Sequence, residues 1–204
     1  TDLAGNAATS SLVFTRDTSV AAPTVSLAND TGSSNGDGIT ADVSLTLSTP
    51  AETVTREFSL DGGTTWTSAY VPPVTDGTYT LAVRDTDLAG NAATSSLVFT
   101  RDTSAPLAQT TTIASISIDS RIAGDFITNQ ASVTVQGAYT GTLDGGEKFQ
   151  VSADGGSSWA DATSVAGVWF ATVTLSAGIG TLSTRTIDAA GNATGGVSRG
   201  YTLD

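Results

Sequence analysis

The sequence predicts an all-β protein built from tandem sandwich domains that follow one another end to end. A block of 19 residues, TDLAGNAATSSLVFTRDTS, occupies residues 1–19 and returns without a change at residues 86–104. Between clusters of turn residues, the chain consists of short runs in which apolar and polar residues alternate, as they do in half-buried strands. We find no stretch with the 3.6-residue apolar spacing of a helix. An offset of 85 residues is too long for a solenoid repeat and suits a string of separate small domains.

Further blocks recur in the same order along the chain. GDGITAD at residues 36–42 matches GDFITNQ at residues 124–130, and FSLDGGTTW at 58–66 matches VSADGGSSW at 151–159. A weaker third copy of the first block, IDAAGNATGGVSRGYTLD, closes the chain at residues 187–204. Chance does not easily produce several matched blocks in one order, so the chain is predicted to be a tandem repeat.

The repeated blocks set the predicted domain boundaries. Residues 1–19 are interpreted as the C-terminal remnant, the last loop and strand, of a preceding repeat. Residues 20–104 form one complete domain, and residues 105–204 form a longer, diverged one. The conformation of residues 1–19 is left open, since they are expected either to be disordered or to add as a strand to an exposed sheet edge.

Each domain contains six predicted strands. In the first domain they are Thr24–Leu27, Val43–Ser48, Arg56–Leu60, Thr64–Ser68, Thr78–Asp85 and Thr94–Arg101. In the second domain they are Ser115–Ile118, Ser132–Gln136, Lys148–Ser152, Val168–Leu175, Gly180–Asp188 and Ser198–Leu203. Six or seven strands in about 85 to 100 residues fit an immunoglobulin-like sandwich. Leu81, Val83, Leu97 and Phe99 are expected to face its core together with Trp66.

Composition excludes several classes of function. The chain has no His and no Cys, which removes the commonest general base, zinc-thiolate sites, disulfides and thiol nucleophiles. Twenty acidic residues against eight basic ones give a net charge of −12, which argues against binding nucleic acid or anionic membrane surfaces. No apolar run approaches the roughly 20 residues of a membrane-spanning helix, so no membrane insertion is expected.

Two motifs give the chain a resemblance to a known group. The D-x-AGN-A…D-T-x-AP ending, together with DTG…DGIT-x-D after the first strand, resembles the bacterial Ig-like tandem repeats of giant cell-surface adhesins. The resemblance implies secretion to the bacterial cell surface, a place in cell adhesion or biofilm, and calcium bound where domains meet. It is looser in the second domain, where Asp42 is replaced by Gln130 and the DTG motif becomes Asp119-Ser120-Arg121.

The acidic loops are the candidate Ca²⁺ sites. If the first strand runs away from the preceding domain, Asp30 and Asp37 lie at the far end beside Asp102, facing Asp188 and Asn192 of the next domain. By the same argument, Asp17 lies near Asp87 and Asn91 upstream. Carboxylates that converge repel one another unless a cation joins them, and Ca²⁺ takes about 6–8 oxygen ligands. The predicted metal-binding residues are Asp17, Asp30, Asp37, Asp87, Asn91, Asp102, Asp119, Asp125, Asp188, Asn192 and Asp204.

A simpler reading of the same residues stays open. Asp and Asn cap tight turns through their own side chains, and Gly permits left-handed backbone angles, without any metal. The S-x-D-x-G-x-T-W pattern at residues 59–66 resembles the Asp-box hairpin of sialidase-type propellers, and it too is interpreted as a turn that sets Trp66 in the core. Two copies are too few for a propeller.

The sequence therefore predicts a non-enzymatic structural role. The chain is expected to be a spacer or stalk of a surface adhesin, stiffened by Ca²⁺ between domains, with neighbouring Ig-like repeats of the same chain as its partners. The alternative is a ligand-binding Ig-like module that recognises a glycan, a host protein or a biofilm surface. Exposure of Trp159 and Trp169 would favour that alternative, since exposed aromatic rings stack on sugars, and burial of both would disfavour it.

Overall fold

The computed structural model describes residues 1, 3–120 and 122–204, and the chain is all-β. Across these residues there are sixteen strands and no helix. The predicted all-β class is confirmed. The chain forms two compact units, one made of residues 1–26, 46–71 and 80–97 and the other of residues 27–45, 72–79 and 98–204. The division between the units falls within four strands, β1 (Val25–Leu27), β3 (Leu45–Leu47), β5 (Gly77–Asp87) and β6 (Ala92–Arg101).

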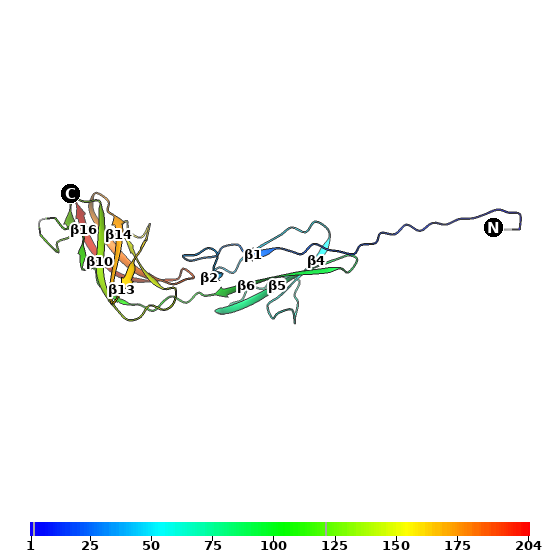
Figure 1. Cartoon of the computed structure of the whole chain (residues 1–204), viewed down its shortest axis with the longest axis horizontal. Helices are drawn as coiled ribbons and strands as arrows, with labels where there is room; N and C mark the ends of the chain where they lie inside the picture. The colour runs from blue at the N-terminus through cyan, green and yellow to red at the C-terminus, as the bar shows by residue number, and fades with distance from the viewer. Residues whose placement is uncertain (2, 121) are drawn as a thin grey trace. The chain divides into compact units, whose positions relative to one another are not determined.

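The C-terminal hundred residues form a sandwich of two sheets (Figure 1). One sheet has the order β13-β14-β10-β7, and β8 also pairs with β10; its strands are β7 (Thr110–Thr111), β8 (Ser115–Ile116), β10 (Ser132–Thr140), β13 (Thr163–Val165) and β14 (Val168–Thr174). The other has the order β12-β11-β15-β16-β9; its strands are β9 (Ile127–Thr128), β11 (Lys148–Ser152), β12 (Ala160–Asp161), β15 (Gly178–Ile187) and β16 (Ala193–Leu203).

Alternation along the strands builds the core of this sandwich. On β14, Trp169, Ala171 and Val173 are buried while Phe170 and Thr172 are exposed, because successive side chains point to opposite faces of a sheet. The opposite sheet contributes Phe149, which is 1% exposed. Trp169 on β14, at 0% exposure, is the largest fully buried side chain of this cluster.

The first repeat has two sheets as well. One contains β1 (Val25–Leu27) and β3 (Leu45–Leu47), and the other has the order β2-β6-β5-β4. The strands of this second sheet are β2 (Ile39–Thr40), β4 (Val54–Ser59), β5 (Gly77–Asp87) and β6 (Ala92–Arg101). β2 runs parallel to the end of β6, with Ile39 opposite Thr100 and Thr40 opposite Arg101.

The expected core residues of the first repeat are mostly buried. Leu81 and Val83 are 0% exposed and Phe99 is 1% exposed, whereas Leu97 is only half-buried. Trp66 does not enter this core. It is half-buried beneath Arg84, so the prediction that it faces the core is wrong.

The first repeat lacks the strand that β14 provides in the second. Residues 160–177, between Trp159 and β15, contain three strands, whereas residues 67–76, the corresponding connection, are eight residues shorter and contain none. The predicted strand Thr64–Ser68 is reduced to one isolated bridge between Phe58 and Thr67. The prolines at 72 and 73 have no backbone N–H to give to a sheet, which disfavours a strand in this short connection.

Residues 1–19 and 86–104 have the same sequence and different structures. In the second copy the block ends β5, turns, and forms β6, where Phe99 is 1% exposed. The described residues of the first copy form no strand, and its Leu12 and Phe14 are 85% and 78% exposed. Figure 1 shows this N-terminal segment as an extended ribbon without arrows. The block becomes a strand only beside partners such as β5 and β2.

Candidate metal centre

The turn between β5 and β6 holds the carboxylate of Asp87 in a fixed position. Its Oδ1 accepts hydrogen bonds from the backbone N–H groups of Ala89 (2.9 Å) and Asn91 (2.8 Å), and its Oδ2 accepts one from Asn91 Nδ2 (2.7 Å). Asp87 is only 7% exposed. The hydrogen bond from the Asn91 side-chain amide is the main cause that lowers the pKa of Asp87. The Asp87 carboxylate is therefore fully ionised at neutral pH.

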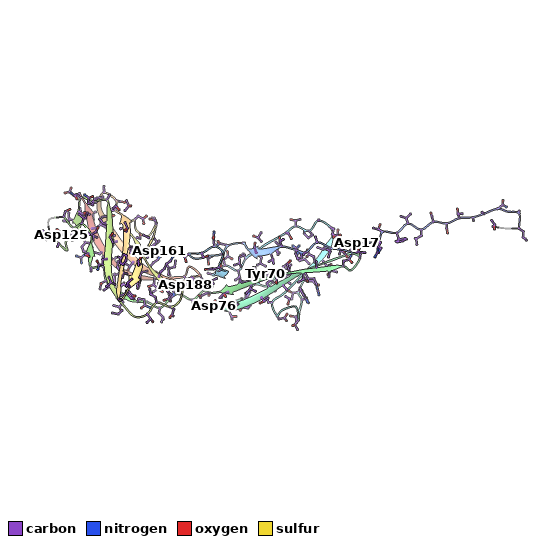
Figure 2. All side chains as sticks on the ribbon, viewed as in Figure 1. Asp17, Tyr70, Asp76, Asp125, Asp161 and Asp188 are labelled. Atoms are coloured by element: carbon purple, nitrogen blue, oxygen red, sulfur yellow. The ribbon has the colours of Figure 1, made fainter. Side chains whose placement is uncertain are left out.

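Two further carboxylates approach Asp87. One oxygen each from Asp17, Glu52 and Asp87 lie within 4.8 Å of one another. Asp17 and Glu52 are exposed and come from the N-terminal segment and from the loop between β3 and β4. Figure 2 labels Asp17 where the N-terminal segment reaches the strands of the first unit. Three carboxylates at this spacing repel one another unless a cation is bound, and they match the oxygen ligands that Ca²⁺ prefers.

Sequence reasoning paired Asp17 with Asp87 but missed Glu52. The neighbourhood of Glu52, Ser-Thr-Pro-Ala-Glu, carries no motif, and its place depends on how the loop before β4 turns back toward β5. Asn91, also predicted as a ligand, uses its side-chain amide to donate to Asp87 instead. Among the described residues, no other three acidic side chains bring their oxygens within 4.8 Å of one another.

The second repeat reproduces the Asp87 turn at Asp188. Asp188 Oδ1 accepts from the backbone N–H of Asn192 (2.9 Å) and Oδ2 accepts from Asn192 Nδ2 (3.0 Å), which also donates to the backbone oxygen of Asp102 (3.1 Å). Asp102 and Asp188 line an open pocket of about 400 Å³ together with Asp144 and Glu147. These four acids share one pocket, but no three of them meet as closely as the group around Asp87.

A second pattern is common to the loops that precede β2 and β9. Asp30 Oδ2 accepts from the N–H of Gly38 (3.0 Å), and Asp119 Oδ2 accepts from the N–H of Gly124 (2.6 Å). In both residues the other oxygen, Oδ1, is buried and has no hydrogen-bond partner in the described part of the chain. A buried carboxylate oxygen without a partner is costly, and a bound cation or water would satisfy it.

The remaining predicted ligands act within their own loops. Asp37 Oδ1 accepts from the N–H of Ile39 (3.0 Å) and Asp125 Oδ1 from the N–H of Ile127 (3.0 Å), which are turn-capping bonds. Asp204 is exposed, and its backbone N–H donates to the Thr128 oxygen (2.9 Å). Arg121, part of the sequence that replaces the DTG motif, lies outside the described residues.

The Asp-box-like hairpins are turns, as the sequence indicated. Asp154 Oδ1 accepts from the N–H of Ser158 (2.9 Å), and its Oδ2 accepts from the hydroxyl of the same residue (2.5 Å). The Ser158 side chain is the main reason that the pKa of Asp154 falls to about 2. Asp61 makes the matching bonds to Thr65, whose side chain likewise lowers the pKa of Asp61.

The tryptophan of each hairpin lies under an arginine on the outer face of the sheet. The Arg84 guanidinium stands 4.0 Å from the centre of the Trp66 ring, and that of Arg185 stands 4.2 Å from the centre of the Trp159 ring. One face of each indole is therefore occupied by a cation–π contact. Trp169 is fully buried and cannot stack on a sugar, whereas Trp159 is half-buried with one ring face under Arg185.

Comparison with known proteins agrees with this fold. The sequence profile of a family described as "Bacterial Ig-like domain" matches residues 19–103. This segment is therefore similar to bacterial Ig-like domains. The fold is also similar to that of fibronectin(III)-like modules of CbhA from Clostridium thermocellum, 12% identical, with a TM-score of 0.55 and coverage of 89% of this chain and 94% of that one. Folds of this class usually serve as structural or binding modules.

Two longer structures also match. One is a tetra-tandem repeat from the extending region of a large adhesion protein, 19% identical with a TM-score of 0.28. The other is SGBP-B of the Bacteroides ovatus mixed-linkage glucan utilization locus, solved with a heptasaccharide, 16% identical with a TM-score of 0.26. Each match covers 89% of this chain, which spans about half of their length, 49% and 48%. A comparison with curated protein sequences gave no match. No helix in the described part of the chain is long and apolar enough to cross a membrane.

Proposed function

We propose that this chain is a spacer segment of a bacterial surface adhesin and that Ca²⁺ stiffens it at each repeat boundary. The observation that carries the proposal is the approach of Asp17, Glu52 and Asp87 to within 4.8 Å of one another. Asp17 belongs to the end of one copy of the repeated block, and Asp87 belongs to the turn of the next copy. A cation bound by both would tie the end of one repeat to the body of the next.

The chemistry of the group favours a hard divalent cation. All three ligands are carboxylates, Asp87 is held in place by its own turn, and the chain has neither His nor Cys to offer a softer ion. Ca²⁺ accepts irregular sets of carboxylates and backbone oxygens, whereas Mg²⁺ demands near-octahedral geometry and keeps its waters. The unpaired buried oxygens of Asp30 and Asp119 support further cation sites on the loops before β2 and β9.

The proposal extends to location and partners. An adhesin spacer acts outside the cell, and a Cys-free, acidic chain that needs calcium suits export before folding. Its direct partners are neighbouring Ig-like repeats of the same chain, and the surface ligand belongs to another part of the adhesin. The ligand-binding alternative gains little from the aromatic residues, since Trp159 is stacked under Arg185 and Trp169 is buried.

Calorimetry of the chain with and without Ca²⁺ tests the proposal. At a Ca²⁺ concentration 100 times the dissociation constant, linkage stabilises the folded state by about 2.7 kcal/mol. For a unit of this size, that raises the melting temperature of the first repeat by on the order of 10 °C. Glu52→Gln and Asp17→Asn should reduce the shift, whereas Glu57→Gln, which alters an acid paired with Arg84 at 2.7 Å, should not reduce it.

Two outcomes would contradict the metal centre. One is a melting temperature that Ca²⁺ leaves unchanged, and the other is a Ca²⁺ shift that survives in the Glu52→Gln variant. If Mg²⁺ raised the melting temperature by the same amount, the site would be one for divalent cations in general and not for Ca²⁺ in particular. Isothermal titration gives the number of ions bound and thus separates the Asp87 group from the Asp30 and Asp119 loops.

A further inference from the structure

The loop before β2 packs directly on the turn between β15 and β16, and both lie in the same compact unit. The hydroxyl of Thr31 donates to the backbone oxygen of Ala190 (2.5 Å), and Ala190 is 1% exposed. Gly32 lies so close to the turn that a Cβ on it would stand 1.8 Å from the backbone oxygen of Ala189. Its φ of +102° also favours glycine. Only a residue without a side chain fits at this position.

The same turn occurs in the first repeat without this neighbour. The turns at residues 87–91 and 188–192 have matching hydrogen bonds, and their glycines have nearly the same φ, 90° at Gly90 and 92° at Gly191. A Cβ on Gly191 would stand 3.0 Å from the Cα of Gly32, whereas one on Gly90 would meet nothing within 4 Å. The two glycines therefore share a backbone conformation and differ in what packs against them.

The segment that joins the repeats is held from the side of the first repeat. The Asp76 carboxylate, in the connection before β5, accepts hydrogen bonds from the hydroxyls of Thr103 (2.9 Å) and Ser104 (2.8 Å). It also forms an ion pair with Arg101 at the end of β6. These bonds fix the direction in which the chain leaves β6.

The same segment is held from the side of the second repeat. Asn192 Nδ2 donates to the backbone oxygen of Asp102 (3.1 Å), and Thr194 Oγ1 donates to that of Pro106 (2.5 Å). A connection bound along its length has few of the conformations that a free linker of the same length would sample. The polar groups of the junction thus find partners within the chain itself.

We propose that the Thr31–Gly32 loop is a docking surface for the Asp-x-Ala-Gly-Asn turn of the repeat that follows, and that this contact holds the junction in one arrangement without a bound cation. The partner that fits is a tight turn whose backbone oxygens face the loop and whose glycine leaves room for a second glycine. The contact joins neutral groups, so salt should affect it little. The second repeat has Asp119-Ser120-Arg121 in place of Asp-Thr-Gly, so its sequence does not provide the same surface.

Two spin labels on the full 204-residue chain measure how well the junction is fixed. The chain contains no Cys, and the exposed residues Ser96 on β6 and Thr174 on β14 can be changed to Cys and labelled. Pulsed dipolar spectroscopy in EDTA should give a single narrow distance distribution. Gly191→Ala should lose the narrow peak, whereas the matched control Gly90→Ala should keep it, because nothing packs against Gly90.

Calorimetry of the same variants gives a second readout. Gly191→Ala should lower the melting temperature of the second repeat by at least about 4 °C more than Gly90→Ala lowers that of the first. Thr31→Val tests the other side of the contact, since it keeps the shape of the side chain and removes the hydroxyl bonded to Ala190. It should also broaden the distance distribution, whereas Ser33→Ala, an exposed position in the same loop, should not.

The outcomes separate this proposal from the proposed role of Ca²⁺. Equal distance distributions for the Gly191→Ala and Gly90→Ala variants would refute the docking contact. A distribution that is broad in EDTA and narrows only when Ca²⁺ is added would also refute it, and would support stiffening by the cation. A distribution that is narrow in EDTA, with a melting temperature that Ca²⁺ leaves unchanged, would support docking and count against the metal centre.

Discussion

An ion pair inside the first repeat permits a sharp test of how this small sandwich is stabilised. Arg56 on β4 faces Asp85 on β5 and donates from Nε to Oδ1 (2.7 Å) and from Nη2 to Oδ2 (2.6 Å). Its Nη1 donates to the backbone oxygen of Ser48 (2.8 Å). The side chains are only 17% and 3% exposed. The pair with Asp85 raises the pKa of Arg56, so the guanidinium stays charged.

The expected loss of unfolding free energy follows from the burial of both Arg56 and Asp85. Removing one member of a buried ion pair leaves the other charge without compensation and costs about 3–5 kcal/mol. Arg56→Met and Asp85→Asn should each lower the free energy of unfolding of the first repeat by about 3 kcal/mol. For a unit of this length each kilocalorie shifts the melting temperature by roughly 4–8 °C. Each single variant should therefore melt at least about 10 °C below the unaltered protein.

The second repeat shows what replaces the pair. At the equivalent register Phe149 faces Thr186, and they are 1% and 3% exposed. Transplanting these residues as Arg56→Phe with Asp85→Thr removes both charges together, so no orphan charge remains. Replacing a buried ion pair by well-packed residues is often neutral or stabilising, so the double variant should lie within about 1 kcal/mol of the unaltered protein.

Differential scanning calorimetry in EDTA measures these changes without the contribution of any bound Ca²⁺. The transition of the second repeat is the internal control, because none of the substitutions touches it. Single variants that cost less than about 1 kcal/mol, or a double variant that costs the sum of the two, would show that Arg56 and Asp85 are not a buried, coupled pair.

Three further predictions concern the second repeat and the turns. Since folding lowers the pKa of Asp154 to about 2, below the usual value of about 3.9, the ionised turn stabilises the folded state above about pH 4. That contribution is lost as the pH falls toward 2, and Asp154→Asn should flatten this part of the stability profile in urea titrations at pH 2–6. Gly137→Ala should destabilise the second sandwich by about 1–3 kcal/mol, because a Cβ there would stand 1.8 Å from the Thr112 oxygen and 2.4 Å from the Trp169 ring. Gly145→Ala, with nothing within 4 Å, is the matched control, and equal melting temperatures for the two would refute the packing argument. Trp169→Ala should cost about 3–5 kcal/mol, measured as loss of the second calorimetric transition, and a smaller loss would mean that β14 does not close the core.

The fold class followed from alternation and repeats, but the strands themselves depended on distant partners. Lys148–Ser152 was predicted with the observed bounds, since a short apolar run there is closed by a Gly-Gly turn. Residues 1–19 show the limit most clearly. An identical sequence forms β6 beside β5 and stays extended without it, so no local rule could assign both copies. The first repeat lacks a counterpart of β14 because the connection before β5 is eight residues shorter than its equivalent in the second repeat. No motif predicts how this difference in length changes the strand pairing.

The candidate site was likewise recognised in part. Asp17 and Asp87 belong to conspicuous motifs, and topology placed them together, whereas Glu52 lies in an unmarked loop and reaches the group through the path of that loop. Trp66 was assigned to the core because large aromatic residues are usually buried. It lies instead on the outer face under Arg84, whose guanidinium also pairs with Glu57 at 2.7 Å.

The two repeats differ in where their stability comes from. The second sandwich has a continuous core around Trp169, Phe149 and Val135, with β14 covering β10. The first sandwich has a charged pair at the position of Phe149, half-buried leucines on β3, and a carboxylate group whose members repel one another. Of these features, the repulsion within the carboxylate group is the one that a bound cation would relieve. The first repeat should therefore gain more stability from Ca²⁺ than the second does.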